Sequence, residues 1–162
     1  MYSIQQLQAL DYLLKRIVNE KEYKFYKQDL KFVVEVKGSL WYGDFIQVDN
    51  TSAYQKYIDD GGDVETVYFR PDNGSKILQD IWKRYVEVCQ AGFSNPFERI
   101  KDLHLLFNSL INILETTEID ESSSPFYPYL LNAITLDNKI ELPFINLKGE
   151  TVKLISIIEN KK

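Results

Sequence analysis

Two helical apolar stripes follow one another within residues 77–114, and they constrain the fold more than any other feature. The first stripe stops near Gly92, a residue suited to a helix end. The second has a start signal, with Asn95 as the cap, Pro96 at the first helical position and Glu98 two residues further on. The stripes comprise Ile77, Leu78, Ile81, Trp82, Tyr85, Val86 and Cys89, then Phe97, Ile100, Leu103, Phe107, Leu110, Ile111 and Leu114. This spacing predicts a long helical hairpin that packs against a sheet.

Residues 4 to about 20 predict a third, N-terminal helix, by the same periodicity argument. Ser3 followed by Gln6 has the form of a capping box, which satisfies two backbone donors at a helix start. Apolar residues then recur at helical spacing at Ile4, Leu7, Leu10, Leu14, Ile17 and Val18. We therefore expect an amphipathic helix that shares the core of the hairpin.

Runs rich in aromatic and β-branched residues predict strands between the helices. We expect a hairpin formed by Tyr23–Tyr26 and Lys31–Lys37, then a strand over Leu40–Val48 that Gly43 interrupts. Further along, the expected elements are a short helix within residues 50–58, a strand over 64–70 and a turn at 71–74.

Residues 115–128 have the composition of a loop, and strand character returns after them. The runs 134–136, 140–145 and 151–158, separated by short turns, predict a C-terminal β-meander. The fold class is thus α+β: one domain over residues 1–162 with a mainly antiparallel sheet. A subdivision into a main body, 1–115, and the meander, 130–162, is the alternative.

Composition excludes several classes of protein. With 44% apolar and 27% charged residues, the chain matches ordinary globular proteins. Cys89 is the only cysteine and His104 the only histidine, so an intramolecular disulfide and a zinc site of Cys and His ligands are excluded. No signal-like start and no apolar run of roughly 18 residues is present, so we expect a cytoplasmic protein that does not bind membranes. The Lys, Asn and Ile usage suits an AT-rich bacterial or phage genome.

The net charge is −5, and it is concentrated in the middle of the chain. Residues 38–80 carry eight acidic and three basic side chains. No segment offers the clustered Lys and Arg that bind phosphate backbones, so direct nucleic-acid binding is not expected. Another protein, of basic character and handling nucleic acid, is the favoured partner.

The most enzyme-like pattern is Glu35-Val36-Lys37, since alternate strand residues share a face. With Asp44 from the next strand, Glu35 and Lys37 could serve a metal-dependent phosphodiesterase or nuclease. A solvated strand face with a cross-charged pair explains the same residues. We therefore keep this enzyme as the alternative to a binding protein.

An acidic run beside Gly61-Gly62 is a further candidate metal site. It consists of Asp59, Asp60, Asp63 and Glu65, whose oxygens suit Ca²⁺ or Mg²⁺ but lack EF-hand spacing. A helix end followed by a turn has the same composition, so we expect no bound metal and no cofactor. His104 and Cys89 fall on apolar helix faces, where we expect a buried, hydrogen-bonded histidine and a packed thiol.

Aromatic residues make up 14% of the chain, with 11 tyrosines. Two local clusters lie next to predicted loops, Trp41-Tyr42 and Phe126-Tyr127 with Tyr129. Exposed Trp and Tyr anchor protein interfaces, whereas buried ones build the core. With the acidic run, these clusters favour a non-enzymatic acidic binding domain of inhibitor, immunity or adaptor type. A structural subunit that self-associates through the meander is the second alternative.

Overall fold

The computed structural model describes residues 2–19, 30–45, 76–90, 102–118 and 128–159. In chain order these contain α1 (Ile4–Asn19), β1 (Leu30–Val36), β2 (Ser39–Asp44), α4 (Lys76–Gln90), α5 (Leu103–Thr116), β3 (Tyr129–Thr135), β4 (Glu141–Asn146) and β5 (Val152–Glu159). The arrangement is α+β, with an antiparallel sheet, as the sequence predicts. The expected strands at 23–26 and 64–70 and the helix within 50–58 lie outside the described residues.

Helix α1 begins with the predicted capping box. The Ser3 hydroxyl oxygen accepts a hydrogen bond from the backbone N–H of Gln6, at 3.1 Å. In return, the side-chain oxygen of Gln6 accepts from the backbone N–H of Ser3, at 2.8 Å. Because these donors have no partner within the helix itself, the reciprocal pair fixes where α1 starts.

A tight turn joins β1 to β2 and sets their register. Lys37 and Gly38 form the turn, both with positive φ (52° and 80°), as a two-residue type I′ hairpin requires. The strands pair from Phe32 opposite Gly43 to Val36 opposite Ser39. The sequence correctly predicted a break at Gly38, although it assigned the hairpin partner of β1 to residues 23–26.

The C-terminal strands join the main sheet, whose order is β4-β3-β2-β1-β5. Strands β3 and β4 form a hairpin, and β3 pairs with β2. Strand β5 instead crosses to the opposite edge and pairs with β1. The expected continuous meander is therefore wrong at its last step. The physical reason is burial, since Ile157 and Leu154 of β5 pack into the helical core beside β1.

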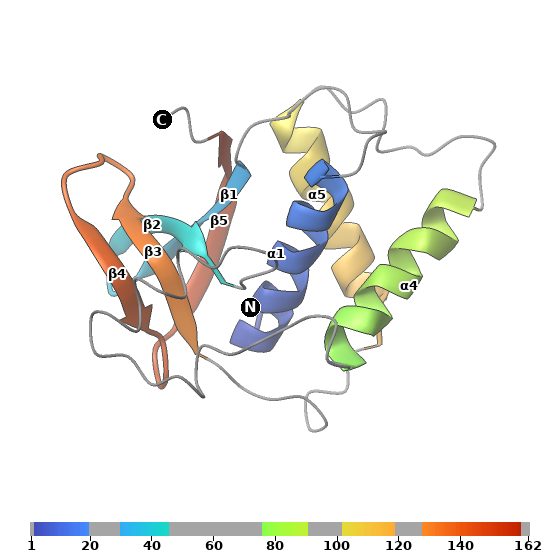
Figure 1. The fold of residues 1–162 in the computed structure, drawn as a ribbon, viewed down its shortest axis with the longest axis horizontal. Helices are drawn as coiled ribbons and strands as arrows, with labels where there is room; N and C mark the ends of the chain where they lie inside the picture. Colours follow the sequence, from blue (N-terminus) through green and yellow to red (C-terminus); the bar gives the residue numbers. More distant parts are fainter. Residues whose placement is uncertain (1, 20–29, 46–75, 91–101, 119–127, 160–162) are drawn as a thin grey trace.

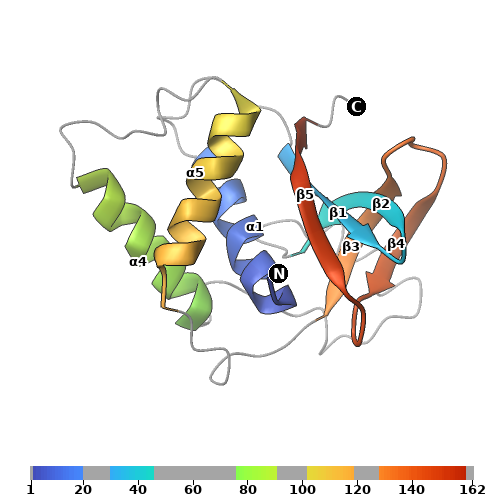
Figure 2. The same ribbon diagram turned by 180° about the vertical axis from the view of Figure 1, so that it is seen from behind.

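The helices lie to one side of the sheet, and α1 is the central element (Figures 1 and 2). Helices α1 and α5 contact strands β1 and β5, while α4 packs on α1 and α5 on the side away from the sheet. Of the two helices predicted to pack against the sheet as a hairpin, α5 contacts it directly, whereas α4 packs on α1 and α5 instead. Within the described ranges, no helix is long and apolar enough to cross a membrane.

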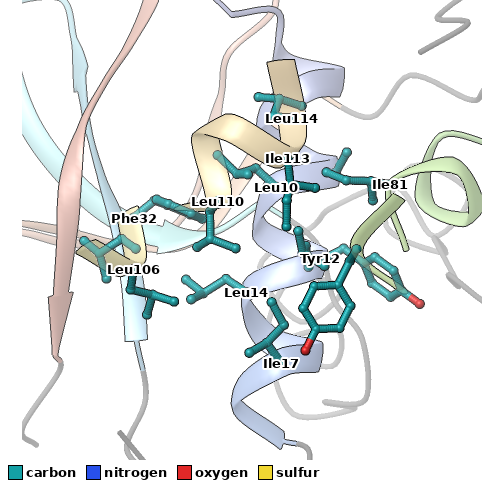
Figure 3. Packing of buried hydrophobic residues seen from close by; sticks show 14 of the residues in the cluster. Leu10, Tyr12, Leu14, Ile17, Phe32, Ile81, Leu106, Leu110, Ile113 and Leu114 are labelled. Carbon is teal, nitrogen blue, oxygen red and sulfur yellow. The ribbon is translucent and has the colours of Figure 1, made fainter. Parts of the chain in front are cut away.

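The main core joins the three helices of the described residues to strands β1 and β5 (Figure 3). Phe32 from β1 is 1% exposed, and its ring meets that of Phe107 edge-on, with centroids 6.4 Å apart. Around it, α1 and α5 contribute Leu10, Leu14, Ile17, Leu106, Leu110, Ile113 and Leu114. At the outer layer, the Arg16 guanidinium lies 3.6 Å from the Trp82 ring centroid, a cation–π contact between α1 and α4.

Helix α5 starts later than predicted. Its N-cap is Asp102, whose carboxylate accepts from the backbone N–H groups of His104 and Leu105 at 2.7 and 3.4 Å. The sequence placed the start at Asn95-Pro96, and residues 91–101 lie outside the described residues. Asp is as good a cap as Asn, and the sequence prediction did not include Asp102 as a start signal.

Gly43 is required where β2 passes β3. A Cβ at this position would lie 2.6 Å from the backbone oxygen of Leu131 and 3.2 Å from that of Asn132. We predict that Gly43→Ala lowers the free energy of unfolding by about 1–3 kcal/mol, because backbone must move apart to admit the methyl group. Urea unfolding measures this. Gly38→Asn is the control, expected to cost under about 0.5 kcal/mol because asparagine tolerates positive φ and the site is open. Equal costs would contradict the steric explanation.

Candidate functional site

Four charged side chains form a buried cluster where α1 meets the β1–β2 hairpin. Lys15 Nζ lies 2.5 Å from Asp11 Oδ2 and 3.0 Å from Asp44 Oδ1. Lys31 Nζ lies 2.5 Å from the same Asp44 oxygen. The side chains of Asp11 and Asp44 are 0% and 6% exposed. Two carboxylates and two ammonium groups therefore balance each other out of water.

Local geometry explains how these residues meet. Asp11 and Lys15 are four residues apart on α1, so they share a helix face. Phe32 of β1 is paired with Gly43 of β2, so Lys31 and Asp44, the next residues along each strand, lie opposite each other. Asp11 Oδ2 also accepts the backbone N–H of Phe45 at 2.9 Å. The cluster thus ties the middle of α1 to the end of β2.

Burial and the neighbouring charges act in opposite directions on the pKa values of this cluster, and the stronger effect differs from residue to residue. Desolvation alone would raise the pKa of Asp44, but attraction to Lys15 and Lys31 outweighs it and lowers that pKa to about 2. Desolvation dominates at Asp11, so its pKa is raised despite the Lys15 charge. At Lys15, burial opposes the charged form, yet Asp11 and Asp44 together hold its pKa above the ordinary value.

These shifts predict a pH dependence of stability. Asp44 has a depressed pKa in the folded state, so its contribution is present above the unfolded value of about 3.9 and is lost as pH falls toward 2. Losing this contribution lowers the free energy of unfolding by about 2 kcal/mol, at about 1.4 kcal/mol per pKa unit. Asp11 has the opposite sign, because a raised pKa stabilises the protein at low pH and loses that effect as pH rises.

Urea unfolding of the wild type and of Asp44→Asn, measured between pH 2 and 6, tests the pH dependence that Asp44 contributes. We expect the difference in free energy of unfolding between wild type and variant to shrink by about 2 kcal/mol from pH 5 to pH 2. An advantage that stays constant over this range would contradict the assigned pKa of Asp44.

The cluster is a structural connection and offers little surface to a ligand. Its charges are mutually compensated, and a buried pair of this kind holds elements in place more than it adds stability. Within the ranges that the structure describes, no group of three or more His, Cys, Asp or Glu side chains is placed to hold a metal ion.

The predicted catalytic residues lie at different ends of the hairpin. Asp44 belongs to the buried cluster, whereas Lys37 lies in the turn, 73% exposed, with its Nζ 3.1 Å from Glu150 Oε1. Glu35 pairs with Leu40 of β2 and Lys153 of β5, four residues along β1 from Lys31. At about 3.3 Å per residue, this separates Glu35 from the cluster by roughly 13 Å. The structure does not bring the three residues together.

The predicted binding residues are placed as follows. Trp41 is half-buried and packs against Val34, Val36 and their neighbours. Tyr42 is 3% exposed, and its hydroxyl donates to the side-chain oxygen of Asn138 in the β3–β4 turn. Tyr129 is half-buried, edge-on to the Phe144 ring at 5.8 Å. The other candidates lie outside the described residues: Phe126, Tyr127, Asp59, Asp60, Asp63 and Glu65.

His104 and Cys89 have different surroundings. Cys89 is half-buried and packs against the main core, as expected. His104 is exposed, so its predicted burial is wrong. It lies in the first turn of α5, where its Nε2 is 3.2 Å from the side-chain nitrogen of Asn108. The physical reason is the helix face, because His104 lies with the exposed Leu105 and Asn108 on the side of α5 opposite the buried Leu106 and Leu110.

An apolar row crosses the β4 edge of the sheet, from the half-buried Trp41 to the exposed Ile140 and Leu142. Trp41 of β2 pairs with Thr135 of β3, whose backbone N–H donates to the carbonyl of Ile140 at 3.0 Å. Directly paired residues share a face, so Trp41 and Ile140 lie on one face, about 10 Å apart across two strand spacings. Leu142, two residues on from Ile140, lies on the same face. Ile140 and Leu142 are 52% and 38% exposed.

We call Trp41, Ile140 and Leu142 the hairpin surface. The β3–β4 hairpin, which carries Ile140 and Leu142, lies at the end of the molecule farthest from α4 (Figures 1 and 2). Ile140 and Leu142 were predicted as part of a strand over residues 140–145 but not as binding residues. The available signal was the pair of apolar residues, Leu136 and Ile140, that flank the polar Asp137-Asn138 turn.

The two edge strands carry features that oppose strand-to-strand association. Pro143 lies in the middle of β4 and has no backbone N–H to offer a further strand. On β5, the register with β1 passes from Ser156 to Leu154 and leaves Ile155 in a bulge. These features do not favour the self-associating alternative.

Comparison of the chain with protein-family models, with curated proteins and with solved structures found no match.

Proposed function

We propose that the chain is a non-enzymatic, acidic protein-binding domain of inhibitor, immunity or adaptor type, which acts in the cytoplasm on another protein. The observation that carries the proposal is the hairpin surface. Large apolar side chains that stay exposed on one face, beside a Trp, are typical of the central part of a protein interface.

The charge of the chain supports a basic partner. The net charge of −5 attracts basic surfaces at long range and speeds encounter with them. Of the exposed charged residues near the hairpin surface, Asp137 and Lys139 lie in the adjoining β3–β4 turn, whereas Glu141 alternates to the opposite face of β4. The net charge alone therefore favours a basic partner, and a basic protein that handles nucleic acid fits it, since its own ligand is a polyanion.

Pull-down from a lysate of the native host tests the proposal. The bait variants are Ile140→Ser/Leu142→Ser and, as a matched control, Leu105→Ser, which removes a 55% exposed leucine from α5 on the helical side. We expect the wild type and the control to retain one partner stoichiometrically. The double variant should retain it at least tenfold more weakly, which corresponds to about 1.4 kcal/mol.

Two outcomes would contradict the proposal. Equal retention by all three baits would show that the partner does not bind the hairpin surface. The variant Phe126→Ala/Tyr127→Ala would then test the second predicted aromatic cluster. Retention of only a second copy of the chain would favour the self-associating subunit. Tyr42→Ala is unsuitable as a bait, because Tyr42 is buried and its loss would disturb the fold.

A further inference from the structure

We draw no further inference here: the strongest candidate, the apolar row of the half-buried Trp41 and the exposed Ile140 and Leu142 at the β4 edge of the sheet, already belongs to the proposed function, and nothing in the structure shows what covers it.

Discussion

Asp44→Ala is expected to lower the free energy of unfolding by about 3–5 kcal/mol, because it removes the carboxylate that both Lys15 and Lys31 contact. The two ammonium groups would remain in a site where their side chains are 17% and 11% exposed, with Asp11 as the one carboxylate of the cluster. Urea unfolding at pH 7 measures the loss.

A charge-balanced double variant separates charge from packing. Asp44→Leu/Lys31→Met removes one carboxylate and one ammonium group and leaves the Asp11–Lys15 pair intact. Apolar replacement of a buried ion pair is often neutral or stabilising, so we expect this variant to lose far less than Asp44→Ala. Equal losses in the two variants would show that uncompensated charge is not the cause.

Phe32→Ala is expected to lower the free energy of unfolding by about 3–5 kcal/mol. Phe32 joins the sheet to α1 and α5, and its alanine replacement would leave a cavity at the centre of the main core. Neighbouring leucines on two helices cannot all move into the space, so the transfer cost and the cavity cost add. Thermal and urea unfolding measure the effect.

Phe32→Leu is the matched control, because it keeps most of the buried apolar volume. We expect it to cost about 1.5 kcal/mol at most. If Phe32→Ala were as mild as Phe32→Leu, β1 could not pack on the helices as described, and the edge-on contact with Phe107 would be in doubt.

Local signals predicted the elements well. The Ser3–Gln6 capping box fixes the start of α1 with contacts inside one turn, so the sequence contains all the information needed. The periodicity of the later helical stripes identified α4 and α5 for the same reason. The start of α5 at Asp102 was not predicted, because the apolar periodicity in the sequence already begins at Phe97.

Features that depend on long-range contacts could not be predicted. Strand β5 pairs with β1 because Ile157 packs into the helical core. The turn residues between β4 and β5 do not indicate this distant contact. The four-charge cluster combines residues from α1, β1 and β2, so Asp44 was instead grouped with Glu35 and Lys37 by proximity in sequence. The hairpin surface depends on which residues of β3 and β4 are paired, which no single strand reveals.

Hydrogen exchange of the chain, free and in complex with the captured partner, tests the central claim most directly. We predict slower exchange in the complex at residues 40–42 and 133–142, with α4 and α5 unchanged. The same segments should show no protection when the Ile140→Ser/Leu142→Ser variant is mixed with the partner. Protection confined to α4 or α5, with free exchange across the β3–β4 hairpin, would contradict the assignment of the binding surface.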